Sequence, residues 1–125
     1  MSYQAVILTV SDSCAAGTRT DTSGPAIRAM LENAGFAVQA MQTVPDEEGQ
    51  ISAAIVHDCD ILQADLVVTT GGTGLSPRDV TPEATLAVLD REIRAIPVAM
   101  WVEGLKSTPR AMLSRAVAGT RGHTL

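Results

Sequence analysis

The sequence predicts an α/β fold in which a largely parallel sheet is covered by helices on both faces. Residues 4–10 and 66–70 are continuous apolar, β-branched runs, and residues 36–44 alternate between apolar and polar. The first pattern is typical of strands buried on both faces and the second of a half-buried strand. A segment with the periodicity of an amphipathic helix follows each strand. Successive strand–helix units of this kind form parallel sheets, because each helix packs back onto the sheet.

The composition limits the classes of protein that fit. The 125 residues suffice for one domain with its own core, and 46% hydrophobic against 2% aromatic residues make that core aliphatic. This composition excludes a disordered or low-complexity chain. A net charge of −5 without interleaved aromatic residues argues against a nucleic-acid-binding surface.

Sorting features predict a cytoplasmic protein. The first three residues lead directly into a strand-like segment, so we expect no signal peptide. We also expect no membrane association, because no apolar run reaches the ~18 residues of a membrane span. Cys14 and Cys59 are the only cysteines, and both are expected to be unpaired thiols in a reducing compartment.

The first strand, residues 4–10, precedes a polar segment at 11–22 that is long for a strand–helix connection, and such loops are often functional. A helix is predicted to start at Ser23, with Ser23 or Asp21 as its cap and a proline in its first turn. Gly35 is expected to follow its end. The buried stripe predicted for this helix consists of Ile27, Met30, Leu31 and Ala34.

The second unit contains the strand at 36–44, which Pro45 ends. Asp46, Glu47 and Glu48 then place negative charge at the start of a helix, where the helix dipole favours it. Its predicted buried stripe consists of Ile51, Ala54, Ile55, Cys59 and Leu62.

The third strand runs directly into a glycine-rich loop, and further helices follow it. Thr81, with Pro82 and Glu83 behind it, predicts a capped helix that continues through Leu89. Pro97 is predicted to open another helix. Residues 111–118 fit either a helix or a helical turn followed by a strand. The apolar face expected for the helix after Pro97 consists of Val98, Trp101, Val102 and Leu105, with Trp101 as a core or subunit-interface anchor.

Three polar loops, at 11–22, 45–48 and 71–79, follow the three strands. The carboxyl ends of parallel strands meet at one edge of a sheet, and ligands of such sheets bind there. We therefore expect these loops to lie along one rim and to form the binding site.

The loop Gly71-Gly72-Thr73-Gly74 lets backbone N–H groups approach an anion closely, because no Cβ intervenes. It matches neither a Walker A loop nor a dinucleotide-binding loop. A purely structural turn is the alternative, but its place after a parallel strand favours binding.

Asp46 and Asp79 are candidate ligands of Mg²⁺ beside that loop, as phosphoryl or nucleotidyl transfer requires. Asp79 is alternatively a partner for a substrate amine or a turn residue paired with Arg78, and Asp46 is alternatively an ordinary acid at a helix start. Ser11 and Asp12 end the first strand at the same rim, and Asp12 has an alternative role in bonding the amides of its own turn. Asp21 and Ser23 are alternatively simple helix caps beside an anion-binding helix start.

From Lys106 onward the chain carries four basic residues and no acid, so this segment is predicted to face a small anionic ligand. No cage of His and Cys and no nucleophile–base pair can be identified from spacing. The residues alone thus predict a pocket at the sheet edge for an anionic, phosphorylated ligand.

The segment from Asp65 to Thr85, with GGTG followed by RDVTPEAT, resembles the signature of the molybdenum cofactor biosynthesis family. That family includes molybdopterin adenylyltransferases, the protein B branch and the gephyrin G domain. Stretches at 9–12, 21–24 and 108–119 agree with it as well. The resemblance implies a three-layer α/β/α domain, residues 1–125, that forms trimers or hexamers. It also implies a further strand, loop and helix after Leu125, which this sequence lacks.

The resemblance further implies that the protein binds molybdopterin and Mg·ATP and adenylylates the pterin. Asp46 and Asp79 match the catalytic, metal-associated carboxylates. The matching ligand-binding positions are Ser11, Asp12, Asp21, Ser23, Gly71, Gly72, Thr73, Gly74, Glu83, Ser114 and Arg115. A non-catalytic pterin- or nucleotide-binding oligomer of the same family and a scaffold module are the alternatives.

Overall fold

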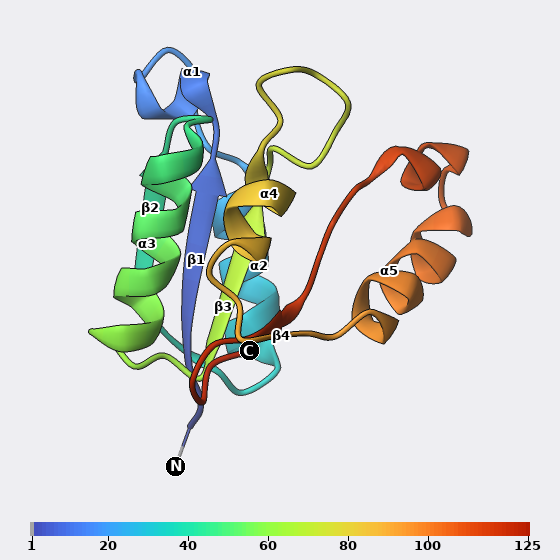
Figure 1. The fold of residues 1–125 in the computed structure, drawn as a ribbon. Coiled ribbons are helices and arrows are strands. Elements are labelled where there is room, and N and C mark those ends of the chain that lie inside the picture. The colour runs from blue at the N-terminus through green and yellow to red at the C-terminus, as the bar shows by residue number, and fades with distance from the viewer. Residues whose placement is uncertain (1) are drawn as a thin grey trace.

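Three parallel strands form the central sheet of the computed structural model, which describes residues 2–125 (Figure 1). They are β1 (Gln4–Val10), β2 (Ala37–Val44) and β3 (Leu66–Thr70), in the order β2-β1-β3. Both pairings are parallel, so the three carboxyl ends point to one edge, drawn at the top of Figure 1. The sequence predicted the strands and their direction, and both are confirmed.

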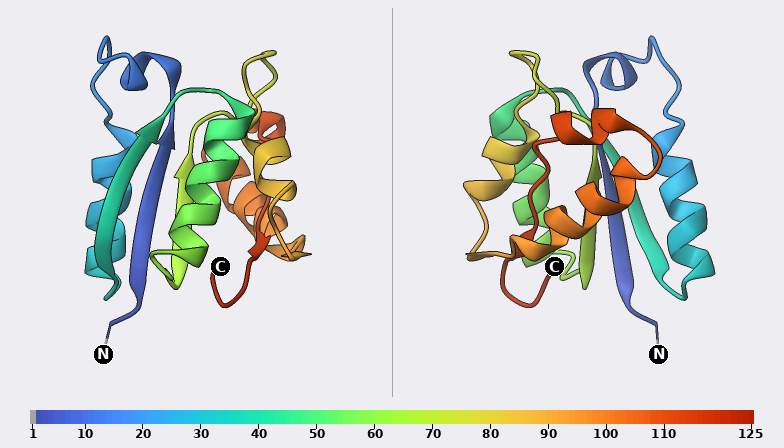
Figure 2. Two further views of the ribbon diagram at one scale, coloured as in Figure 1. Left: turned by 60° about the vertical axis from the view of Figure 1, so that its left-hand side comes forward. Right: turned by 90° about the vertical axis from the view of Figure 1, so that its right-hand side faces the viewer.

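Helices cover both faces of this sheet, and the predicted fold class is therefore confirmed. α2 (Ser23–Asn33) packs against β1 and β2 on one face, and α3 (Glu48–Asp60), with α4 (Thr81–Leu86) against it, lies on the other (Figure 2). Because it lies between these layers, β1 is buried along nearly its whole length. β2 alternates between half-buried and exposed residues, as its sequence pattern predicts.

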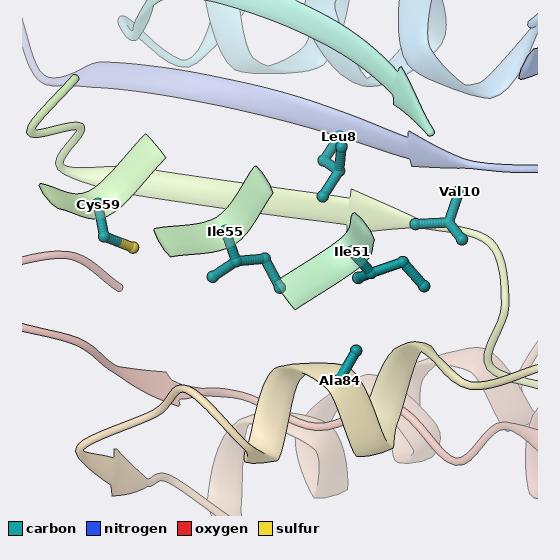
Figure 3. Packing of buried hydrophobic residues seen from close by; sticks show 6 residues of the cluster. All are labelled: Leu8, Val10, Ile51, Ile55, Cys59 and Ala84. Atoms are coloured by element: carbon teal, nitrogen blue, oxygen red, sulfur yellow. The ribbon is translucent and has the colours of Figure 1, made fainter. Parts of the chain in front are cut away.

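The core lies between β1 and α3 and is aliphatic, as the composition predicts. Figure 3 shows its members, whose side chains converge from β1, α3 and α4. Tyr3 and Phe36 instead pair near the amino-terminal edge of the sheet, with ring centroids 6.3 Å apart. The core cluster consists of Leu8, Val10, Ile51, Ile55, Cys59 and Ala84.

Several local predictions are wrong. A short helix, α1 (Asp12–Ala15), lies within the segment predicted to be a loop, with Ser11 as its cap. In α2, Met30 is exposed, because this helix covers the sheet with Gly24, Ile27 and Leu31. β3 is half-buried rather than fully buried, because most of its outer edge has no neighbouring strand.

The C-terminal third departs furthest from the sequence pattern. α4 ends at Leu86 rather than Leu89, and β4 (Arg91–Glu92) pairs antiparallel with β5 (Gly119–Thr120). α5 (Ala95–Leu105) packs against the short 3₁₀ helix η1 (Pro109–Leu113), and both lie beyond the free edge of β3 (Figures 1 and 2). Of the face predicted for the helix after Pro97, Val98, Val102 and Leu105 are about half exposed, whereas Trp101 is half-buried.

A carboxyl group lies in the buried face of α3. Asp58 is fully buried, and its Oδ1 accepts a hydrogen bond from Gln42 Nε2 at 2.7 Å and lies 3.5 Å from His57 Nδ1. Its Oδ2 and the Oε1 of Gln42 are both without a partner among the described residues. Burial is the main influence on this carboxyl and raises the pKa of Asp58. Ionisation of Asp58 is therefore less favourable in the folded state than in the unfolded chain.

Replacing Asp58 by Asn is expected to stabilise the protein at pH 7.5 by about 1–3 kcal/mol, the penalty typical of an unsatisfied buried polar group. Because the folded pKa of Asp58 lies above the unfolded one, ionisation destabilises the fold as pH rises from about 3.8 through the folded pKa. The Asn variant cannot ionise and so does not lose this stability. The difference in free energy of unfolding between the variant and the parent, measured with urea, should therefore be smaller at pH 4 than at pH 7.5.

Asp60→Asn on the same helix is the matched control. Arg121 holds the pKa of Asp60 below its usual range, so this substitution should lower stability at pH 7.5. An Asp58→Asn variant that is no more stable than the parent at pH 7.5 would contradict the prediction.

Candidate functional site

The three rim loops meet at the carboxyl ends of the strands, as the sequence predicts. The backbone N–H of Asp12 donates to Asp46 Oδ2 at 3.0 Å, and the N–H of Asp46 donates to Asp12 Oδ1 at 2.9 Å. Ser11 N–H donates to the carbonyl of Val44 at 2.9 Å. The loop after β1 is thereby tied to the loop after β2.

The glycine loop lies directly against these two loops. Gly71 and Gly72 have φ values of +96° and +71°, which favour glycine. A Cβ on Gly71 would meet the carbonyl oxygen of Val10, and one on Gly72 would meet Thr81 Oγ1 and lie 3.2 Å from Asp46 Oδ1. The glycines therefore bring the backbone into close contact with the end of β1 and with a carboxylate.

The glycine loop also has backbone donors available. No acceptor among the described residues receives a backbone hydrogen bond from Gly72, Thr73 or Gly74. The carbonyls of Gly71 and Gly72 are instead bound by the hydroxyl and the N–H of Thr81, at 2.9 and 3.1 Å. This loop is fixed by its carbonyl groups and can offer its N–H groups to an anion.

Asp46 and Asp79 lie on either side of this loop. Asp46 Oδ1 faces Gly72, and Asp79 Oδ2 would lie 2.9 Å from a Cβ on Gly74. Asp79 Oδ2 accepts the N–H of Ser76 at 2.9 Å. The interpretation of Asp79 as a partner of Arg78 is wrong, because Arg78 binds other carboxylates. The two acids predicted to hold a metal thus both lie beside the glycine loop.

Arg78 connects all three loops, a role that sequence reasoning missed. Its guanidinium donates to both carboxylate oxygens of Asp12, at 3.1 and 2.9 Å, and to Glu47 Oε1 at 3.1 Å. These hydrogen bonds hold the pKa of Asp12 below its usual range. Only the tertiary contact reveals the role, since Arg78 is 66 residues from Asp12.

Arg115 reaches the glycine loop, but its guanidinium is occupied by protein acceptors. The guanidinium donates to the carbonyls of Gly74 and Asp79 at 2.8 and 2.7 Å. It also forms a two-pronged pair with Glu83. The backbone N–H of Arg115 donates to the carbonyl of Thr73 at 2.9 Å. The pair lowers the pKa of Glu83 and raises that of Arg115. Arg115 thus holds the loop in place through its backbone and its side chain.

Three of the four bases in the C-terminal segment, which the sequence predicts to face an anion, have carboxylate partners. Lys106 pairs with Glu103, Arg115 with Glu83 and Arg121 with Asp60. Glu103 lies three residues before Lys106, whereas the fold brings Glu83 and Asp60 to Arg115 and Arg121 from distant segments.

Ser11 and Asp21, also predicted as site residues, have structural partners, whereas Ser23 does not. Ser11 caps α1, and Asp21 caps α2 by accepting the N–H of Gly24 at 3.0 Å. Asp21 also accepts the Thr9 hydroxyl at 2.9 Å, which ties the start of α2 to the end of β1. Ser23 is exposed and does not provide the cap. Likewise, Thr81 is not the cap of α4, because its hydroxyl binds Gly71.

A cavity of about 370 Å³ adjoins the glycine loop along the free edge of β3. Gly71, Thr73 and Ser114 line its end at the rim, and the rest is largely apolar. At the amino-terminal end of β3, the N–H of Leu125 donates to the carbonyl of Asp65 at 3.0 Å, and its carbonyl accepts from the N–H of Val67 at 2.8 Å. The edge can therefore accept a neighbouring strand beyond this point.

Two carboxylates beside free backbone donors fit Mg²⁺, which proteins hold with one or two carboxylates together with substrate phosphates. Asp46 and Asp79 each use one oxygen in the hydrogen bonds above, and the other accepts none from the described residues. No cluster of three or more His, Cys, Asp or Glu side chains suited to a metal occurs within residues 2–125. The arrangement suits an ion that arrives with a phosphorylated substrate.

Solved structures share this fold. A molybdopterin biosynthesis enzyme MoaB from Thermus thermophilus is 48% identical, with a TM-score of 0.93 over 98% of this chain and 77% of that one. A molybdopterin biosynthesis protein from Mycobacterium abscessus is 42% identical, also with a TM-score of 0.93, over 98% of this chain and 77% of that one.

Among curated proteins, the molybdopterin adenylyltransferase of Helicobacter pylori (strain J99) is 38% identical over 95% of this chain and 69% of its own length. The chain spans only about a fifth to two-fifths of three longer relatives, namely cinnamon of Drosophila melanogaster, gephyrin of Dictyostelium discoideum and a bifunctional protein of Chlorobaculum tepidum. The family model described as a probable molybdopterin binding domain matches residues 6–125. The chain therefore belongs to the family of probable molybdopterin binding domains that acts in molybdenum cofactor biosynthesis.

Proposed function

We propose that this protein is a molybdopterin adenylyltransferase that takes Mg·ATP and molybdopterin as substrates. One observation carries the proposal: Asp46 and Asp79 flank a glycine loop whose N–H groups have no acceptor in the described chain. The similarity to curated molybdopterin adenylyltransferases supports the choice of substrates.

In the proposed reaction, an oxygen of the terminal phosphate of molybdopterin attacks the α-phosphorus of ATP. The bond between the α-phosphorus and the bridging oxygen of the β-phosphate breaks, and pyrophosphate leaves. Little covalent chemistry is required of the protein, so positioning and charge stabilisation supply the catalysis. Mg²⁺, when bound, would neutralise charge that develops on the phosphates.

The residues of this chain have distinct tasks in the proposed reaction. The N–H groups of the glycine loop would bind phosphate oxygens, and Asp46 and Asp79, which flank the loop, would hold the metal. Arg115, oriented by Glu83, holds the loop through the carbonyls of Gly74 and Asp79. The functional groups are therefore fixed before the substrates arrive, which lowers the entropy lost on reaching the transition state.

Incubation of the protein with molybdopterin, Mg²⁺ and labelled ATP tests the proposal. We expect pyrophosphate and adenylylated molybdopterin in equal amounts, and EDTA should abolish both. ATP without molybdopterin is the control and should release no pyrophosphate. Binding of pterin or nucleotide without pyrophosphate release would overturn the enzymatic function and favour a non-catalytic binding protein.

We also propose that the protein forms a homo-oligomer, a trimer or a pair of trimers. The apolar residues along α5 and η1 support this: Met100, Val102, Met112 and Leu113 are all more than half exposed. Apolar patches of this kind commonly mark subunit interfaces. The molar mass in solution, measured by light scattering, tests the proposal.

Two further proposals concern domain extent and location. We propose that residues 1–125 form a single domain whose sheet takes one more strand along β3, which the pairing of Leu125 with that strand supports. We also propose a cytoplasmic location, which the free thiols of Cys14 and Cys59 support. No helix among the described residues is long and apolar enough to span a membrane.

A further inference from the structure

Arg78 is the centre of a small ion-pair network at the rim. Arg78 belongs to the loop after β3. Its guanidinium forms a two-pronged pair with Asp12, in the loop after β1, and a third contact with Glu47, in the loop after β2. All three side chains are about half exposed. A single exposed pair contributes little to stability, but a forked guanidinium fixes the orientation of the carboxylate it binds.

The network continues from Asp12 to the proposed catalytic site. The same Asp12 carboxylate that binds Arg78 accepts the N–H of Asp46, and the N–H of Asp12 binds the Asp46 carboxylate. Asp46 is thus held at both its backbone and its side chain by one residue. The oxygen of Asp46 that Asp12 does not use is the one that lies beside Gly72.

We propose that Arg78 is a positioning residue for Asp46 and acts on it through Asp12. This proposal rests on the proposed function, since it gives Arg78 a part in the adenylyl transfer. Arg78 already has three carboxylate contacts, and it orients the acid rather than binding the substrate phosphate. Lys would keep the positive charge but lose the fork, so it should not replace Arg78.

Kinetics of Arg78→Lys, Asp12→Asn and the double variant test the proposal. Each single variant should lower kcat about ten- to a hundredfold, the range typical of partners that orient a metal ligand, with little change in KM for ATP. The double variant should be no slower than the slower single variant, because both changes break one chain of contacts. Arg28→Lys, which alters an exposed pair with Glu32 on α2, is the matched control and should leave kcat unchanged.

A raised KM for ATP in Arg78→Lys, or losses that multiply in the double variant, would overturn the proposal and indicate direct contact with a substrate anion. Thermal unfolding followed by circular dichroism should show that all variants remain folded.

Amide hydrogen exchange gives a test that does not depend on activity. Arg78→Lys should speed exchange at the N–H groups of Asp12 and Asp46, and leave that of Gly24, which Asp21 holds, unchanged. Unchanged exchange at Asp46 would overturn the proposal even in an active enzyme. If the parent protein shows no adenylyl transfer, the proposed function fails, and the exchange rates still decide whether Arg78 positions Asp46.

Discussion

Asp79→Asn is expected to reduce pyrophosphate release about a hundred- to a thousandfold, the loss typical when one group that stabilises transition-state charge is removed. Asn keeps the size of the side chain and can still accept the N–H of Ser76 through its amide oxygen. The variant loses the negative charge that we assign to holding Mg²⁺. The rate of pyrophosphate release at saturating Mg·ATP measures the effect.

The fold should survive this change, because the Asp79 side chain makes only one hydrogen bond with the described residues and is partly exposed. Asp90→Asn is the matched control, since Asp90 also accepts one backbone N–H, from Gly122, in the turn beside β5. It should retain full activity. Undiminished turnover in Asp79→Asn would show that its carboxylate does not take part in the reaction.

Gly71→Ala is expected to lower the free energy of unfolding by about 2–6 kcal/mol, from backbone strain together with overpacking. The φ of +96° is strained for any residue with a Cβ, and the added atom would press on the carbonyl oxygen of Val10. That oxygen belongs to the backbone at the end of the central strand, so it cannot move aside cheaply. Urea unfolding measures the loss.

Two other glycines separate the causes of this loss. Gly35 has a φ of +99° but open space around it, so Gly35→Ala should show strain alone, about 1–2 kcal/mol. Gly49 lies in the first turn of α3 with open space and no positive φ, so Gly49→Ala should show neither strain nor overpacking. A loss at Gly71 no larger than that at Gly35 would contradict the role assigned to close packing.

The strands and their connections could be predicted because they depend on local patterns. The apolar run at 4–10 became a strand buried between helices, and the alternation in 36–44 became a strand with one inward face. The glycines that directly follow the third strand indicated where the loop at the rim lies. In each case the apolar residues themselves determine which face of the element is buried, whichever element packs against it.

Contacts between distant residues could not be predicted in this way. Asp58 falls on the helical spacing of Ile51 and Ile55, and that spacing was the one signal that could have revealed a buried acid. The threonine at 81 fits a helix cap by sequence, but its hydroxyl binds Gly71, ten residues earlier. A cap contributes only about 1 kcal/mol, so tertiary contacts can override the capping preference of a single threonine.

By itself, the sequence determined the parallel α/β fold, the rim on which the candidate site lies and the acids beside its glycine loop. Hydrophobic periodicity and the conformational freedom of glycine are properties of neighbouring residues, and they are visible in a linear chain. Only the tertiary structure decided the charge partners: Arg115 is bound to Glu83, and Arg78 to Asp12 and Glu47. The energy of a charge depends on which opposite charge the folded chain places within a few ångströms of it, and that distance is not encoded by any local pattern.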